Sequence, residues 1–141
     1  VKTDARMRLQ FDLWEGLSRD DKRQLARLLM VNGVSEAFFQ VSPPELIQAA
    51  IDRFATVLDL GGDRQAALDA SINIQADLAN IRAQTLVIGM VEDRLVPIAH
   101  CRELAAGIAG SRYEALNCGH LVTLEQPDAL MALIEQHLDS N

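Results

Sequence analysis

The sequence has few cysteines, and those it has follow no pattern of a structural site. Cys101 and Cys118 do not fit the spacing of zinc ligands, and two thiols do not make a disulfide framework. No cluster of metal-binding side chains stands out elsewhere. We therefore expect neither a metal site nor a cofactor.

An excess of basic charge and a long hydrophobic run are also missing. The formal net charge is −7, and the basic residues are interleaved with acids, which is typical of a solvated helix face and argues against nucleic-acid binding. No apolar run approaches the roughly 18 residues of a membrane-spanning helix, and the chain does not open on a signal-peptide pattern. These features predict a cytoplasmic protein that binds neither nucleic acid nor membrane.

What is present suffices for a folded domain. The chain has 141 residues, of which 49% are hydrophobic, enough for one ordinary core. It begins with Val1 rather than methionine, which is typical of a processed or truncated chain.

The first part of the sequence has the periodicity of amphipathic helices. Met7, Phe11 and Trp14 recur at helical spacing, and we expect this first helix to stop near Gly16, with Ser18 capping the next one. The pattern predicts helices at residues 3–17, 18–33, 42–60 and 63–74, and a short helical turn at 76–81.

The pattern changes after residue 80. The apolar, β-branched run of residues 83–90 predicts a strand buried on both faces, and residues 112–117 predict a second strand. Helices are expected at residues 97–108 and 126–138. This alternation predicts parallel strands with crossover helices, so the fold class is α/β, with a helical subdomain at residues 1–80 and a strand–helix–strand–helix segment at 81–141.

Two strands are too few for a parallel sheet, which needs neighbouring strands along its edges. We therefore expect the second half to be the edge of a larger sheet. Its partner would be an N-terminal segment of the same protein or a second chain.

Two polar residues follow the ends of the two predicted strands. Asp93 comes shortly after the first strand and His120 shortly after the second. Carboxyl ends of parallel strands share one edge of a sheet, so the two side chains are expected to lie close together there. A carboxylate can fix the tautomer of an imidazole and stabilise its protonated form, which leaves the other ring nitrogen free as a general base.

These residues stand in stretches that resemble the C-terminal part of the α/β-hydrolase superfamily. The stretches are "VIGMVEDRLVP", at residues 87–97, and "YEALNCGHLVTLEQPDALMALIEQHL", at residues 113–138. The resemblance implies that Asp93 is the acid and His120 the base of a catalytic triad, with Glu92 as the alternative acid. It also implies that residues 1–80 form an inserted helical lid.

The expected nucleophile motif is missing from the sequence. Members of this superfamily carry a nucleophile on a G-x-S-x-G turn before the acid and the histidine, and this sequence has no such motif. The alternative nucleophile is Ser35 in "GVSEA", which would require the preceding "LLMV" to form a strand rather than a helix. Cys118 is better explained as a small buried hydrophobe, and His100 as a polar surface residue.

The resemblance further implies a small-molecule substrate with an apolar part. Phe11, Trp14 and Phe38 are candidates for lining its pocket. We thus expect part of a hydrolase that cleaves an ester, lactone or thioester-like bond and that is inactive as the isolated chain. The alternative is a non-catalytic assembly module that pairs its sheet edge with a second chain and forms oligomers.

Overall fold

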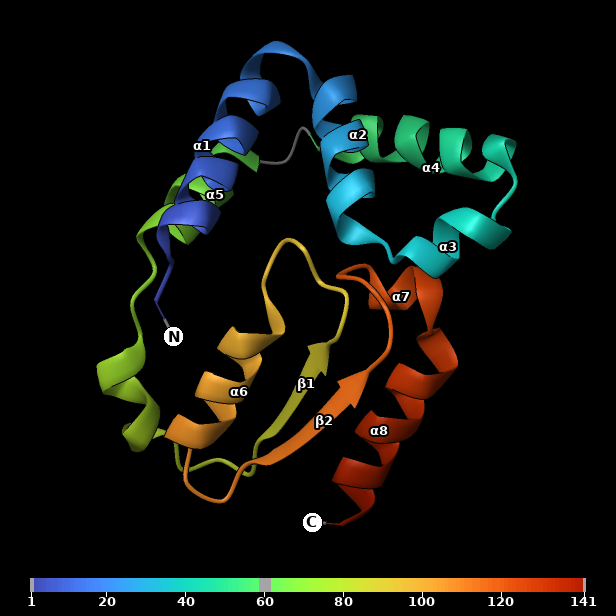
Figure 1. Ribbon diagram of the computed structural model, residues 1–141. Coiled ribbons are helices and arrows are strands. Elements are labelled where there is room, and N and C mark those ends of the chain that lie inside the picture. Colours follow the sequence, from blue (N-terminus) through green and yellow to red (C-terminus); the bar gives the residue numbers. More distant parts are fainter. Residues whose placement is uncertain (1, 59–61, 141) are drawn as a thin grey trace.

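The computed structural model describes residues 2–58 and 62–140 (Figure 1). The elements, in chain order, are α1 (Ala5–Asp20), α2 (Lys22–Gly33), α3 (Glu36–Val41), α4 (Pro44–Val57), α5 (Gly62–Ser71), the 3₁₀ helix η1 (Gln75–Asn80), β1 (Leu86–Met90), α6 (Ile98–Gly107), β2 (Arg112–Leu116), α7 (Val122–Glu125) and α8 (Pro127–Asp139). The predicted end of the third helix, residues 59–60, lies outside the described residues.

Two pairs of helices form the upper part of the molecule in Figure 1. Helix α1 packs along α5, and α2 packs along α4. Each pair has its own apolar cluster, because each helix turns one apolar stripe toward its partner. Met7, Phe11 and Ala66 are buried in the first cluster, and Met30 and Ile51 are among the residues buried in the second.

The predicted boundary between the first two helices was wrong. Helix α1 continues through Gly16 to Asp20, and Ser18 lies inside it, where its hydroxyl donates to the Glu15 carbonyl. The cap of α2 is Asp21, whose carboxylate accepts the Gln24 N–H at 3.0 Å. A glycine inside a helix costs only about 1 kcal/mol relative to alanine, which packing against α5 offsets here.

Helix α3 was not predicted. Its N-cap is Ser35, whose hydroxyl accepts the Phe38 N–H at 3.1 Å. Ser42, at which the predicted helix 42–60 was expected to begin, is instead the C-cap residue of α3. Helix α4 begins after Pro43 without a side-chain cap.

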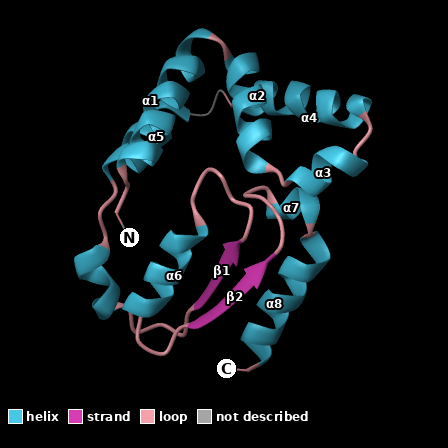
Figure 2. Ribbon diagram, in the orientation of Figure 1, coloured by secondary structure: helices cyan, strands magenta, loops and turns pink. Residues whose placement is uncertain are grey.

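The two strands pair in parallel, as predicted, and form a two-stranded sheet (Figure 2). Gly89 of β1 stands opposite Ala115 of β2. A Cβ atom on Gly89 would lie 3.1 Å from Ile98 and 3.2 Å from Cys101, so α6 packs directly on this part of β1. Helix α8 lies beside β2, where the Arg112 side chain donates to Gln136 at 2.6 Å.

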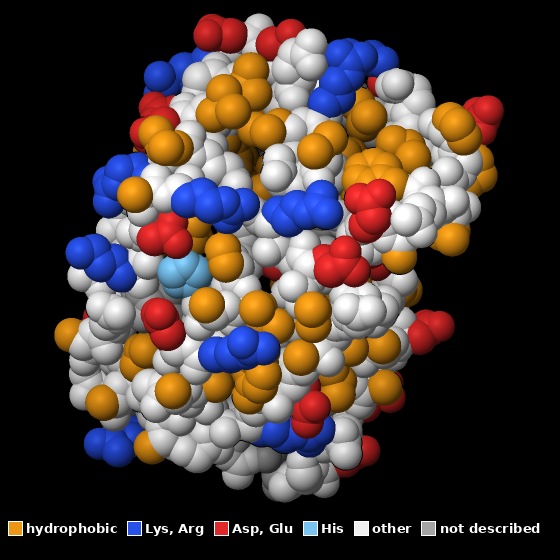
Figure 3. All heavy atoms as spheres, in the orientation of Figure 1, with side chains coloured by type: hydrophobic (Ala, Val, Ile, Leu, Met, Phe, Trp, Pro, Cys, Tyr) orange, Lys and Arg blue, Asp and Glu red, His pale blue; other side chains and the backbone are white. Residues whose placement is uncertain are grey.

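Polar contacts join the helices to the loop that follows β1. Arg6 of α1 donates to the Arg94 carbonyl at 2.6 Å, and Gln10 donates to the Leu95 carbonyl at 3.4 Å. Arg94 lies 3.9 Å from the Glu36 carboxylate. Figure 3 shows basic and acidic side chains next to one another across the middle of this face, between the helices above and the strands below.

The predicted division near residue 80 stays a prediction. Helix η1, which ends at this boundary, packs against α6 on the other side of it. A Cβ atom on Gly107 would lie only 2.5 Å from the Leu78 side chain. Over the described residues, each strand has a single neighbour in the sheet, so one edge of each is unpaired. Within residues 2–58 and 62–140, no helix is long and apolar enough to cross a membrane.

Candidate active site

Asp93 lies in the loop after β1, where the backbone holds its carboxylate in place. The Oδ1 atom accepts two backbone N–H groups, from Leu95 and Val96, each at 2.8 Å. The side chain is only 1% exposed. These two hydrogen bonds fix the carboxylate and leave its Oδ2 atom for a partner outside the loop.

That partner is His120, in the loop after β2. Its Nδ1 atom lies 2.8 Å from Asp93 Oδ2. The hydrogen bond to Asp93 raises the pKa of His120, although partial desolvation of the ring lowers it, and the charge of Asp93 adds to the rise. The structure therefore brings together the two residues that the sequence placed at one edge of the sheet.

The His120 ring is oriented for proton transfer. Because the Asp93 carboxylate can only accept, Nδ1 carries the proton, and Nε2 of the neutral ring has a free lone pair. The side chain is 40% exposed, and within residues 2–58 and 62–140 no hydroxyl or thiol donates a hydrogen bond to it. The pair can thus take a proton from a nucleophile that reaches Nε2 and can stabilise the resulting imidazolium.

The loop that carries His120 is pressed against the turn between α2 and α3. A Cβ atom on Gly119 would lie 2.6 Å from the Gly33 carbonyl oxygen and 2.7 Å from the backbone of Val34. The Leu121 N–H donates to the same Gly33 carbonyl at 2.7 Å. Only glycine at position 119 allows the backbones to approach this closely.

Glu125 joins these two segments through its carboxylate. Oε1 accepts the Gly119 N–H at 2.9 Å and the Ser35 N–H at 3.0 Å, and Oε2 accepts the Ser35 hydroxyl. Glu92, the alternative acid, does not contact His120 in this way: its carboxylate accepts the Glu36 N–H at 3.1 Å. Both glutamates therefore tie the site loops to the start of α3.

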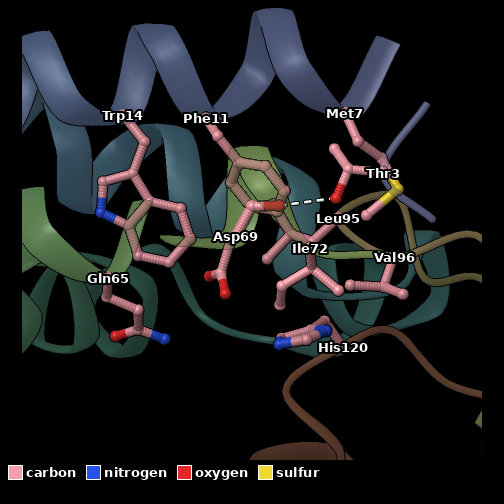
Figure 4. A pocket seen from close by; sticks show the side chains of 10 residues that line it. All are labelled: Thr3, Met7, Phe11, Trp14, Gln65, Asp69, Ile72, Leu95, Val96 and His120. Carbon is pink, nitrogen blue, oxygen red and sulfur yellow. Dashed lines mark hydrogen bonds between the residues drawn. The ribbon is translucent and has the colours of Figure 1, made fainter. Parts of the chain in front are cut away.

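A pocket of about 230 Å³ opens beside His120 (Figure 4). Its walls are mostly apolar and come from α1, α5 and the loop after β1. Phe11 and Trp14 are among them, with ring centroids 6.1 Å apart. The polar lining residues are Thr3, Gln65, Asp69 and His120.

Phe38 does not line this pocket. It packs with the apolar cluster of α2 and α4, edge to face with Phe39 at a centroid distance of 6.3 Å. The structure thus places two of the three predicted pocket residues beside His120 and the third elsewhere.

The remaining candidate residues, Ser35, Cys118 and His100, are all buried. Ser35 is 2% exposed, and the "LLMV" stretch before it is helical, so the strand that a nucleophile turn at Ser35 requires is not formed. Cys118 is buried, and this burial, with the nearby carboxylates, raises its pKa to about 11. The expectation that His100 is a surface residue was wrong: it is 8% exposed, and its Nε2 lies 3.4 Å from Asp4 Oδ2.

Sequence reasoning missed Asp69 and Glu125. Glu125 stands in the "LEQP" stretch that carries the resemblance, which was a signal that it has a fixed role. Asp69 lies one helical turn from Ala66, on the same side of α5. A charged residue beside the buried stripe of a helix is a signal that could have drawn attention to it. In the part of the chain that the structure describes, no group of three or more His, Cys, Asp or Glu side chains could hold a metal ion.

Comparison with solved structures decides the fold. The chain matches the α/β hydrolase MGS-M2, from a Medee basin deep-sea metagenome library, with a TM-score of 0.83 and 21% identity, over 98% of this chain and 52% of that one. The chain has the α/β-hydrolase fold. It corresponds to the C-terminal half of that fold, so the fold that the sequence resemblance predicted is confirmed.

Two further comparisons agree with an α/β-hydrolase fold. The enol-lactonase from Burkholderia xenovorans LB400 matches with a TM-score of 0.77 and 24% identity, over 91% of this chain and 50% of that one. Pyrrolizixenacetamide deacetylase from Xenorhabdus hominickii is 32% identical over 136 residues, which cover 96% of this chain and 51% of that protein. The chain thus spans about half the length of these proteins. No protein-family model matches it.

Proposed function

We propose that this chain is the lid and C-terminal part of an acyl hydrolase, in which His120 is the general base and Asp93 orients it. The observation that carries the proposal is the 2.8 Å contact between His120 Nδ1 and Asp93 Oδ2 beside a mostly apolar pocket. The hydrolases among the similar proteins support the reaction class. The bond cleaved would be an ester, lactone, thioester or amide-type bond.

The proposed reaction uses a nucleophile from a segment outside these 141 residues. His120 Nε2 takes the proton of that nucleophile as it attacks the acyl carbon, and the imidazolium then passes the proton to the leaving group, which departs and leaves an acyl-enzyme. Water, deprotonated by the same Nε2, then attacks the acyl-enzyme, and the imidazolium returns the proton to the nucleophile as the acid is released. Asp93 holds the ring through Nδ1 and stabilises its positive charge during both steps. The unpaired edges of β1 and β2 support a partner that continues the sheet, either an N-terminal segment of the same protein or a second chain.

Turnover of p-nitrophenyl acetate tests the proposal. The protein translated from the complete reading frame is compared with its His120→Ala and Asp93→Asn variants. We expect kcat/KM to fall by about 10²–10⁴ in each, because proton transfer is lost or the ring is misoriented. His137→Ala, on α8 and away from the pocket, is the matched control and should keep the wild-type rate.

Two results would count against the proposal. One is an unchanged rate in His120→Ala. The other is hydrolysis by the 141-residue chain alone at the rate of the complete protein, since the proposed nucleophile lies elsewhere. Equal loss in the His137→Ala control would show that the assay reports folding rather than chemistry.

A further inference from the structure

Asp69 extends from helix α5 into the pocket that His120 borders. Figure 4 shows its carboxylate directed into the space between the aromatic rings of α1 and the His120 ring. Its backbone carbonyl accepts the Thr3 hydroxyl at 2.6 Å, and the Thr3 N–H donates to the Ile72 carbonyl at 3.1 Å. Thr3 therefore holds the backbone both at Asp69 and three residues further along the chain.

The carboxylate itself has no partner. Across residues 2–58 and 62–140, no hydrogen bond or ion pair reaches the Asp69 side chain, and burial alone raises its pKa. A partly desolvated carboxylate without a partner destabilises the folded protein, and a ligand that compensates its charge removes this cost. Neither Asp93 nor His120 has an unmet requirement of this kind, since they satisfy each other.

The surroundings of Asp69 favour a cation as that ligand. Phe11 and Trp14 line the same pocket, and aromatic faces attract ammonium groups. A neutral donor would leave the charge of the carboxylate in place, and an anion would be repelled by it. The net charge of −7 on the chain adds a weak attraction for cations.

We propose that Asp69 binds a protonated amine of the substrate, so that the hydrolase acts on acyl compounds that carry an alkylammonium group. This inference rests on the proposed function for its reaction, while the recognition itself depends only on the pocket. The ammonium group would donate to the Asp69 carboxylate, and the apolar part of the substrate would pack on Phe11 and Trp14.

Ligand binding to the protein translated from the complete reading frame, measured by isothermal titration calorimetry, tests this without any turnover. The probes are benzylammonium chloride and benzyl alcohol, which have the same shape and differ in charge. We expect benzylammonium to bind roughly tenfold more tightly, in line with one charge-assisted hydrogen bond and a cation–π contact.

Asp69→Asn should abolish this preference while keeping the shape of the side chain. The matched control is Asp12→Asn, which removes an equal charge from the exposed face of α1 and should retain it. Equal binding of both probes to the wild type, no binding of either, or a preference retained in Asp69→Asn would each overturn the inference. If Asp69→Asn does not fold, the comparison of benzylammonium with benzyl alcohol on the wild type still decides the matter. None of these results bears on His120 turnover, so failure of this inference is distinguishable from failure of the proposed function.

Discussion

His120 Nδ1 and Asp93 Oδ2 lie 2.8 Å apart, although the two residues are 27 positions apart in the sequence. Parallel pairing of β1 and β2 brings the loops that follow them to one edge of the sheet. The orientation of Asp93 is set by the Leu95 and Val96 N–H groups, so the contact does not depend on a flexible side chain finding its partner. This arrangement has measurable consequences.

Asp93→Asn should lower the pKa of His120 toward the ordinary histidine value of about 6.5. The hydrogen bond to Asp93 is the largest cause of the raised pKa in the wild type, and an amide cannot stabilise the imidazolium as a carboxylate does. Histidine ring signals followed by NMR over a pH titration measure the change. An unchanged His120 pKa would contradict the assigned contact.

The same contact makes stability depend on pH with a definite sign. Because folding raises the pKa of His120, its stabilising contribution is complete below the unfolded value of about 6.5 and is lost as pH rises through the folded value. The difference in unfolding free energy between wild type and His120→Gln should therefore be larger at about pH 5.5 than at about pH 8.5. Urea unfolding at both pH values measures this difference in unfolding free energy. A difference that grows with pH would contradict the stabilisation of protonated His120 by Asp93.

Gly119→Ala should destabilise the protein by about 1–3 kcal/mol, the usual cost of forcing an extra carbon into packed surroundings. The added Cβ would meet backbone atoms of Gly33 and Val34, which cannot move aside as a side chain would. Gly16→Ala is the matched control: it has no neighbour within 4 Å and lies inside α1, so it should stabilise by about 0.5–1 kcal/mol. Chemical denaturation compares the two variants, and equal stability would show that the Gly119 loop can relax.

Glu125→Ala should cost about 1–3 kcal/mol, because it removes the acceptor of the Gly119 and Ser35 N–H groups. These two amides should also exchange with solvent faster, which hydrogen-exchange NMR resolves for each residue. Glu135→Ala, at an exposed position of α8, should change stability by no more than about 0.5 kcal/mol. Wild-type protection of both amides in Glu125→Ala would show that Glu125 does not hold the two segments together.

The sequence predicted those features that depend on local pattern. The apolar run that ends at Met90 predicted β1, and the positions of Asp93 and His120 just after the strands predicted their meeting, because parallel pairing fixes which strand ends coincide. The limits of α1 were missed, since Gly16 and Ser18 are common stop signals that packing against α5 overrode.

Other parts of the site depend on tertiary contacts that no local pattern contains. Nothing near Glu125 in the sequence indicates that Ser35, 90 positions away, would donate to its carboxylate. The pocket position of Asp69 likewise requires α5 to pack along α1, with its end facing the loop of His120. For Phe38, apolar character alone did not indicate that it would pack against the cluster of α2 and α4.

Fluorophosphonate labelling tests whether His120 and Asp93 activate a nucleophile that lies outside these 141 residues. The complete reading frame, its His120→Ala variant and the 141-residue chain are treated with the probe, and adducts are located by peptide mass spectrometry. We expect one adduct on a serine that precedes Val1, slow labelling in His120→Ala, and no adduct on the 141-residue chain. An adduct on Ser35, or labelling that proceeds equally fast without His120, would contradict it.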